Sequence, residues 1–354
     1  MSFKILTLKI GKRLVGGGEP CFIVAEAGVN HNGDVSLAQK LVDSALKAGA
    51  DAVKFQTFTA EELVTIDAPK AEYQKATTGS AESQFEMIKN LELSRDDFKQ
   101  LYIYTKTKGI MFLSTPFDRG SVDFLDKLGV VAFKIPSGEI TNSPLLKHIA
   151  LKRKPIILST GMATLGEIET ALNVLSGAGA KDIILLHCIT SYPAQSEDMN
   201  LRAMQTLRQA FGYPVGLSDH TLGLTIPVAA VALGASLIEK HFTLDRKLPG
   251  PDHRASLEPR ELKAMVRAIR DVEKAMGDGI KRLTKEEEVN KLVVRRSLVA
   301  RVDIPKGAPI TEEMLDARRP ATGIEPSELK LVVGKVARTA IKRGQLITED
   351  MFQV

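Results

Sequence analysis

Two histidines near the ends of neighbouring apolar segments form the arrangement in this sequence that is best suited to binding a metal. His220 ends the segment PVGLSDH over residues 214–220, and His241 lies near the end of SLIEKHF over residues 236–242. Two imidazoles without a thiolate suit Mn²⁺, Fe²⁺, Co²⁺ or Zn²⁺ and leave coordination positions open for water or substrate. The alternative is a pair of hydrogen-bonded structural histidines. Because both stand at adjacent strand ends, we favour His220 and His241 as metal ligands.

Other apolar segments of the chain also carry polar residues at or near their ends. These residues are Glu26; Lys54 and Gln56; Ser114 and Thr115; Lys134, Ser137 and Glu139; Ser159 and Thr160; Thr190 and Tyr192; and Ser218. Any one of them alone reads as an ordinary loop residue, but the pattern recurs at every strand end. Two lysines and several hydroxyls that converge on one opening predict a cradle for a phosphate or carboxylate group. His31 and His253 fall in loops at the same opening, and their role is left open.

The elements that must position these residues are short apolar strands alternating with amphipathic helices. The expected strands cover residues 22–25, 52–57, 110–116, 131–136, 155–159, 182–187, 214–220 and 236–242. Continuous apolar strands between helices indicate a parallel sheet that is covered by helices. Eight such units in about 280 residues favour an α/β fold of the (β/α)8 TIM-barrel type, whose catalytic groups lie at the C-terminal strand ends. A doubly wound sheet would need a GxGxxG turn after the first strand, where this chain has EAGVNHNG.

Local signals place some helix ends and one unusual connection. Thr164 with Glu167 forms a capping-box pattern, and Asn200 is expected to cap a helix over 201–211. The connection over 58–94 is longer than an ordinary strand-to-helix loop, which indicates a lid or part of a subunit contact.

The pattern changes after residue 276, and an internal repeat follows. Residues 300–315 and 337–352 match each other, and each copy reads as strand, glycine turn, short strand and a helical turn capped by Thr311 or Thr348. We therefore expect a barrel domain over 1–282, a linker over 283–296 and a small β-rich domain over 297–354. A domain of this size is marginally stable alone and is expected to dock on another surface.

Composition excludes several classes of function. The formal net charge of +5 arises from scattered lysines and arginines without interleaved aromatics, which favours a small anionic substrate and not nucleic acid. The two cysteines, Cys21 and Cys188, form no disulfide framework and indicate a reducing compartment. No signal-peptide pattern and no apolar run of about 18 residues is present, so we expect a soluble cytoplasmic protein without a membrane span.

Taken together, these motifs resemble the sialic acid (N-acetylneuraminate) synthase family, which includes legionaminic and pseudaminic acid synthases. The matching segments are IVAEAGVNHNG over 23–33, VKFQ over 53–56, KIPSGE over 134–139, STGM over 159–162, residues 216–223 and PGPDH over 249–253. The C-terminal repeat resembles the family's antifreeze-like (SAF) domain. The resemblance implies that phosphoenolpyruvate condenses with an open-chain 2-acetamido sugar aldehyde to give a nine-carbon 2-keto acid and phosphate.

The resemblance also implies residue roles. His220 and His241 would hold Mn²⁺, with Mg²⁺, Co²⁺ or Fe²⁺ as alternatives, as a Lewis acid on the sugar aldehyde. Glu26 would be the acid/base residue. The phosphoenolpyruvate cradle would comprise Lys54, Thr115, Lys134, Ser137, Ser159, Thr190 and Ser218, with Thr190 standing where some members have Asn. The sugar contacts would be Gln56, Glu139, Tyr192 and Asp252. Arg319, in RRPATG over 318–323, would reach the partner's site in a domain-swapped homodimer and bind the N-acetyl group.

Within the family that these motifs resemble, the sugar substrates differ. We expect an N-acetylmannosamine-type sugar that gives N-acetylneuraminate, with the precursor of legionaminic or pseudaminic acid as the alternative. The PGPDH loop favours the first two of these sugars over the pseudaminic precursor. Two other classes of protein are alternatives to a synthase. A non-catalytic carbohydrate-binding protein would not need Glu26 or the histidine pair. A metal-free aldolase would need a Schiff-base lysine, for which Lys54 or Lys134 is available.

Overall fold

The computed structural model describes residues 6–79 and 81–353, which form two compact units over Met1–Gly277 and Asp278–Val354. The first unit contains an eight-stranded parallel sheet with the order β5-β4-β3-β10-β9-β8-β7-β6, and β5 lies beside β6, so the sheet closes. Its strands are β3 (Phe22–Gly28), β4 (Ala52–Thr57), β5 (Met111–Pro116), β6 (Phe133–Ile135), β7 (Ile156–Ser159), β8 (Ile183–Cys188), β9 (Val215–Asp219) and β10 (Leu237–His241). The predicted (β/α)8 barrel is confirmed.

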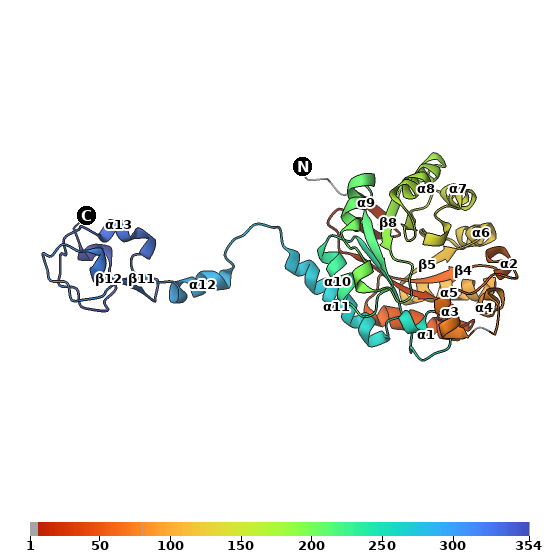
Figure 1. The fold of residues 1–354 in the computed structure, drawn as a ribbon, viewed down its shortest axis with the longest axis horizontal. Helices are drawn as coiled ribbons and strands as arrows, with labels where there is room; N and C mark the ends of the chain where they lie inside the picture. Colours follow the sequence, from red (N-terminus) through yellow and green to blue (C-terminus); the bar gives the residue numbers. More distant parts are fainter. Residues whose placement is uncertain (1–5, 80, 354) are drawn as a thin grey trace. The chain divides into compact units, whose positions relative to one another are not determined.

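Helices surround the barrel strands (Figure 1). They are α1 (Val35–Ala48), α5 (Arg95–Lys108), α6 (Arg119–Leu128), α7 (Ser143–Ala150), α8 (Leu165–Gly177), α9 (Ala203–Phe211), α10 (Thr225–Ala232) and α11 (Pro259–Met276). The capping box of Thr164 and Glu167 is present at the start of α8. The Asn200 prediction is wrong, because Arg202 is the N-cap of α9 and Asn200 takes a left-handed backbone conformation two residues earlier. Among the described residues, no helix combines the length and apolarity that crossing a bilayer requires.

Alternation along the strands divides the barrel core into two layers, because successive side chains point to opposite faces. Outward residues such as Ile23 and Val53 pack against Leu41 of α1 and Leu262 of α11. Inward residues near the strand starts form a separate cluster, which includes Phe22, Val24, Ala52, Leu186 and Leu237.

An N-terminal hairpin that the sequence did not predict closes the bottom of the barrel. Its strands β1 (Thr7–Ile10) and β2 (Arg13–Gly16) are antiparallel. Leu8, Ile10 and Val15 of this hairpin are buried in the inward apolar cluster. The barrel interior is therefore sealed at the N-terminal strand ends, and polar chemistry is confined to the opposite ends.

The described residues of the long 58–94 connection include the short helices α2 (Ala60–Leu63), α3 (Glu72–Thr78) and α4 (Gln84–Asn90). Phe58, Met87 and Leu91 of this segment are buried together with Val29 from the first strand-to-helix loop. Arg254 Nη1 donates to Ala76 O at 3.1 Å, which ties α3 to the loop after β10. The segment is thus anchored at the C-terminal end of the barrel.

The second unit contains α12 (Lys285–Val294), β11 (Ser297–Ala300), β12 (Leu315–Arg318) and α13 (Leu329–Val332). Its two repeats pair through equivalent residues, because Ile304 and Ile341 exchange backbone hydrogen bonds of 2.8 and 2.9 Å. This reciprocity gives the unit an internal pseudo-two-fold arrangement. Both predicted helical turns occur as short 3-10 turns, but neither Thr311 nor Thr348 makes a side-chain cap hydrogen bond. The boundary between the units lies at Gly277, and the expected linker over 283–296 contains helix α12.

Candidate functional site

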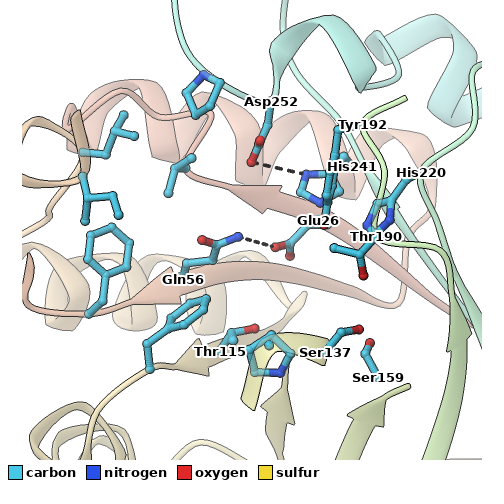
Figure 2. A pocket seen from close by; sticks show the side chains of 18 of the residues that line it. Glu26, Gln56, Thr115, Ser137, Ser159, Thr190, Tyr192, His220, His241 and Asp252 are labelled. Atoms are coloured by element: carbon cyan, nitrogen blue, oxygen red, sulfur yellow. Dashed lines mark hydrogen bonds and ion pairs between the residues drawn. The ribbon is translucent and has the colours of Figure 1, made fainter. Parts of the chain in front are cut away.

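A cavity of about 300 Å³ opens at the C-terminal ends of the barrel strands. The residues of the first unit that were expected to act in the reaction line it, with the exception of Glu139, whereas Ser114 and Thr160, which were marked only as polar strand-end residues, do not. The lining residues among them are Glu26, Lys54, Gln56, Thr115, Lys134, Ser137, Ser159, Thr190, Tyr192, Ser218, His220, His241 and Asp252. Figure 2 shows the labelled members converging from several strands. Strand register accounts for this, since His241 pairs with Glu26, Glu26 with Lys54, and Gln56 with Thr115.

The base of the cavity is a buried network of two lysines and two carboxylates. Lys54 Nζ lies 2.8 Å from Glu26 Oε2 and 3.6 Å from Glu239 Oε2. Lys134 Nζ lies 3.3 Å from Glu239 Oε1, which also accepts a 3.0 Å hydrogen bond from Ser218 Oγ. Glu239 therefore sits between the two cations and holds both, and this acid was not singled out in the sequence.

Hydroxyl groups complete the base. Lys54 Nζ donates to Thr115 Oγ1 at 3.0 Å, and Ser137 Oγ accepts from Gly161 N at 2.9 Å. Ser159 Oγ is buried and has no hydrogen-bond partner among the described residues. Buried polar atoms normally find a partner, so an orphaned hydroxyl that lines a cavity indicates a place for a ligand atom.

The two carboxylates of the base have opposite acidities. Burial raises the pKa of Glu26 to about 7, although Lys54 opposes this shift. Burial also acts to raise the pKa of Glu239, but Lys134 and Lys54 outweigh it and lower that pKa to about 2. Two acids in one site with separated pKa values can take different roles. Glu239 is a fixed counter-charge, whereas Glu26 can exchange a proton near neutral pH.

The predicted histidine pair is brought together, with ring centroids 5.4 Å apart. His220 Nδ1 lies 2.7 Å from Ile189 O, and a ring nitrogen that donates to a carbonyl leaves Nε2 free as a metal ligand. His241 Nδ1 is buried without a partner among the described residues and lies 3.9 Å from Asp252 Oδ2. Burial and the neighbouring His220 hold the pKa of His241 well below its usual value, so His241 is neutral. The pair fits a metal ion.

The metal position would be an open one. In the described part of the chain, no group of three or more His, Cys, Asp or Glu side chains is arranged to hold a metal ion. Two imidazoles alone would leave the remaining coordination positions to water and substrate, as the sequence suggested. Cys188 Sγ lies 3.8 Å from His220 Nδ1. Burial acts to lower the pKa of His220, but Cys188, the Ile189 carbonyl and Glu239 together outweigh it and raise that pKa, so a proton would compete with a metal at this ring.

Aromatic residues form one wall beside the histidines. The ring centroid of Tyr192 lies 4.1 Å from that of His220, and Tyr73 stacks on Tyr192 at 5.0 Å. Tyr73 belongs to α3, so the 58–94 segment contributes directly to the cavity. The sequence did not identify Tyr73, because a tyrosine in a long connection carries no local signal of its position.

Comparison with known proteins is consistent with this geometry. Residues 41–281 match the NeuB family, and residues 295–353 match the SAF domain. The chain belongs to the NeuB family. It is 55% identical to the N,N′-diacetyllegionaminic acid synthase of Campylobacter jejuni over 92% of this chain and 98% of that protein. It is 51% identical to the synthase of the same name from Legionella pneumophila, over 90% and 91%.

Other relatives of this NeuB-family protein are less similar. The pseudaminic acid synthase of Campylobacter jejuni is 38% identical over 94% of this chain and 96% of that protein. The crystal structure of a sialic acid synthetase from Leptospira borgpetersenii superposes with a TM-score of 0.73 at 37% identity, covering 82% of this chain and 96% of that chain. The expected class, a sialic-acid-type synthase that uses phosphoenolpyruvate, is therefore confirmed at the family level.

One predicted site residue of the first unit does not line the cavity. Glu139 ends a 3-10 turn (Ser137–Glu139), and its Oε2 accepts a 2.7 Å hydrogen bond from Asn142 Nδ2. The turn carries Glu139 away from the inward direction that Ser137 takes, and strand alternation could not reveal this. Arg319 is an exposed residue of the second unit.

The two histidines whose role was left open are held by hydrogen bonds within loops. His253 Nδ1 lies 2.7 Å from Thr243 Oγ1, and its Nε2 lies 3.1 Å from Asn32 Oδ1. His31 Nδ1 accepts from Gly33 N at 3.1 Å. Neither lines the cavity, so the two shape the loops around the opening.

A second buried ion pair lies behind the histidines, on the outward face of the same two strands. Asp219 of β9 and Lys240 of β10 are register partners, and both side chains are fully buried. Lys240 Nζ donates to Asp219 Oδ2 and to Thr221 O. Asp219 Oδ1 in turn accepts from Thr221 N at 3.0 Å. The pair thus fixes the residues on both sides of His220 and the residue that precedes His241.

Proposed function

We propose that this protein is an N,N′-diacetyllegionaminic acid synthase. It would condense phosphoenolpyruvate with open-chain 2,4-diacetamido-6-deoxymannose to give a nine-carbon 2-keto acid and phosphate. The observation that carries this proposal is the placement of a cationic, hydroxyl-rich base beside a histidine pair in one cavity. Identity is greater to the legionaminic acid synthases than to the pseudaminic acid synthase or the sialic acid synthetase, which supports the legionaminic precursor over the pseudaminic precursor and N-acetylmannosamine.

Phosphoenolpyruvate would bind at the base. Lys54 and Lys134 face one permanently ionised acid, Glu239, so the base keeps an excess of positive charge when Glu26 is protonated. The phosphate and carboxylate of the substrate would accept hydrogen bonds from these lysines and from Thr115, Ser137, Ser159, Thr190 and Ser218. Charge-assisted hydrogen bonds of this kind are strong, particularly in a water-excluded site. The orphaned Ser159 hydroxyl would gain its partner from the substrate.

His220 and His241 would hold the metal, with Mn²⁺ preferred and Mg²⁺, Co²⁺ or Fe²⁺ as alternatives. When bound, the ion would act as a Lewis acid toward the sugar aldehyde. Asp252, Gln56 and Tyr192 line the same part of the cavity and would orient the hydroxyl and acetamido groups of the sugar. This positioning fixes the aldehyde carbon against C3 of the enol, which removes much of the entropic cost of joining two substrates.

Glu26 would move the protons of the reaction. As the enol π electrons form the bond between C3 and the aldehyde carbon, the protonated Glu26 would donate its proton to the aldehyde oxygen. The resulting carboxylate would then accept a proton from the water that adds to C2. Collapse of that adduct forms the C2 carbonyl, breaks the bond from C2 to the phosphate oxygen and releases phosphate, which takes the hydroxyl proton. A pKa near 7 suits a group that serves as acid and then as base.

The second unit would supply one further sugar contact. In a domain-swapped homodimer, Arg319 would enter the partner subunit's cavity and bind an N-acetyl carbonyl. The match of residues 295–353 to the SAF domain supports this assignment of the module. The docking would also stabilise a domain that is small for independent folding.

Phosphate release tests the proposal directly. The protein is freed of metal by chelation, reloaded with Mn²⁺ and mixed with phosphoenolpyruvate and either 2,4-diacetamido-6-deoxymannose or N-acetylmannosamine. We expect phosphate release with both sugars and a higher kcat/KM for the diacetamido sugar. No release with either sugar would refute the enzyme assignment, and a preference for N-acetylmannosamine would refute the legionaminic one. Borohydride trapping of a substrate adduct on Lys54 or Lys134 would instead favour a Schiff-base aldolase.

A further inference from the structure

We infer that an apolar wall of the cavity is a specificity subsite for the far end of the sugar, and that it selects a methyl-terminated, acetamido-bearing chain. The wall consists of Phe58, Leu63, Val64, Met87, Ile88 and Phe117, all of which line the cavity. This inference rests on the proposed function and deepens it. None of the sequence motifs for the reaction includes these residues, and five of them fall in the 58–94 connection or next to it.

Strand alternation explains why the apolar wall begins where the polar cradle ends. Gln56 and Thr115 are inward-facing neighbours on β4 and β5. Two residues further along each chain stand Phe58 and Phe117, whose rings meet edge to face with centroids 6.1 Å apart. β4 ends at Thr57 and β5 at Pro116, but Phe117 N still donates to Thr57 O at 3.2 Å, so the pairing continues one residue past β5. Residues two apart in extended chain share a face, so these aromatics extend the inner surface of the barrel outward. Figure 2 shows carbon-only side chains gathered beyond Gln56, on the side away from His220.

The wall is only partly explained as the core of the connection. Phe58 and Met87 are buried with Val29 and Leu91 and stabilise the segment. Leu63, Ile88 and Phe117 pack against this cluster but, like Val64, are only partly buried and also line the cavity. Apolar side chains that face a cavity gain free energy when a ligand removes them from water, so they favour apolar ligand groups.

The geometry of the reaction directs the sugar toward this wall. Phosphoenolpyruvate fills the base, and the aldehyde carbon lies beside the histidine pair, so the rest of the sugar extends to the remaining side of the cavity. An extended peptide gains about 3.5 Å for every three backbone bonds, so an open chain of six carbons, which has five bonds, spans roughly 6 Å. Its last carbon is a methyl group in the 6-deoxy sugar and a hydroxymethyl group in N-acetylmannosamine. A hydroxyl buried against the wall would lose its bonds to water without replacement.

Two glutamines beside the wall match the second acetamido group. Gln74 and Gln84 line the cavity, and Gln84 Nε2 donates to Gln74 Oε1 at 3.4 Å. Gln74 Oε1 also accepts from Ala71 N at 2.9 Å, which fixes its orientation. Amide groups at the edge of an apolar surface suit an acetamide, whose methyl would contact the wall while its N–H and C=O pair with a glutamine. A sugar with a hydroxyl at this carbon would satisfy only part of this arrangement.

The test compares four sugars and three variants of the full-length enzyme. The sugars are 2,4-diacetamido-6-deoxymannose, its 6-hydroxy analogue, its 4-hydroxy analogue, and N-acetylmannosamine. For the wild type we expect kcat/KM to fall about 10- to 200-fold when the 6-methyl becomes a hydroxymethyl, the range typical of apolar pockets. Val64→Thr and Ile88→Thr place a hydroxyl on the wall and should shrink this ratio at least threefold, with the KM for phosphoenolpyruvate unchanged. Ile66→Thr is the matched control, because Ile66 is 73% exposed and does not line the cavity.

The outcomes distinguish a failure of the proposed subsite from a failure of the proposed function. If the wild type uses the 6-deoxy and 6-hydroxy sugars equally well, or if both wall variants keep the wild-type ratio, the subsite is wrong while the synthase assignment stands. If no diacetamido sugar is turned over, the proposed function itself fails. A change in the ratio for Ile66→Thr as large as for the wall variants would also overturn the inference. The melting temperatures of all three variants show whether a smaller kcat/KM ratio between the 6-deoxy and 6-hydroxy sugars reflects a misfolded segment.

Discussion

Replacing Lys240 with methionine tests whether the buried ion pair behind the histidines holds the site together. Methionine keeps much of the length of the lysine side chain but removes its charge. Asp219 would then remain fully buried, with hydrogen bonds from Thr221 and no cation beside it. Removing one partner of a buried pair is far more costly than removing both, because the remaining charge is uncompensated.

The size of the effect follows from burial and from the size of the unit. Breaking a fully buried pair typically costs about 3–5 kcal/mol of stability. An unfolding entropy of about 2.1 cal/mol/K per residue gives roughly 0.6 kcal/mol/K for the first unit, Met1–Gly277. We therefore expect Lys240→Met to lower the melting temperature by about 5–9 °C. The double variant Asp219→Asn/Lys240→Met, which removes both charges, should recover about half of that loss or more.

Calorimetry and metal titration together make the measurement decisive. The control is Lys274→Met, because Lys274 forms an exposed ion pair with Asp271 at 3.7 Å and should shift the melting temperature by less than about 2 °C. Misplaced ligands typically weaken metal binding about 10- to 100-fold, so Mn²⁺ affinity of Lys240→Met should fall in that range. The reasoning is refuted if Lys240→Met melts within 2 °C of the wild type. It is also refuted if the double variant is no more stable than the single one.

Three further predictions concern the reaction. In the proposed reaction Glu26 acts in its protonated form, and its pKa is raised from 4.5 to about 7, so kcat/KM should be high below pH 7 and fall as the pH rises through it. Glu26→Gln should lower the rate about 10²- to 10⁴-fold and abolish this limb of the pH profile. If the variant retains the limb, the titrating group is another residue. After chelation, Mn²⁺ should restore phosphate release by the wild type but not by the double variant His220→Ala/His241→Ala. Full activity of the double variant after chelation would exclude the metal site. Arg319→Ala should raise the KM for the sugar about 10- to 100-fold with the KM for phosphoenolpyruvate unchanged. Co-expression of the Arg319→Ala and Glu26→Gln chains should restore about a quarter of the wild-type activity, because about half of the dimers are mixed and each mixed dimer has one intact site of two. No recovery would argue against an arginine that acts across the subunits.

Much of the barrel and its polar base could be predicted from the sequence, because both depend on local pattern. Continuous apolar segments define parallel strands, and polar residues at their ends must meet at one opening. Lys54, Lys134 and Ser218 were found in this way. Glu239 follows the same alternation two residues before His241, so the signal existed, although an acid inside an apolar strand gives no sign of its partners until register is known.

Other features depend on contacts that no local pattern encodes. Tyr73 reaches the cavity only because α3 folds back over the barrel, and the apolar wall arises in the same way from the 58–94 segment. Glu139 was misplaced because a 3-10 turn interrupts strand periodicity after Ser137. Lys240 resembled any lysine in a strand, since its burial depends on the helices that cover the outer face of β10.

The hairpin at the bottom of the barrel has a consequence for the order in which the substrates are added. Leu8, Ile10 and Val15 close that end, so in the part of the chain that the structure describes, the way into the cavity is the opening at the C-terminal strand ends. Lys54 and Lys134 lie at the bottom of this cavity and are only 2% and 3% exposed. A sugar bound nearer the opening would block the route to them. In the proposed reaction, phosphoenolpyruvate must therefore bind first, and a sugar that arrives early forms a dead-end complex, seen as substrate inhibition that excess phosphoenolpyruvate relieves.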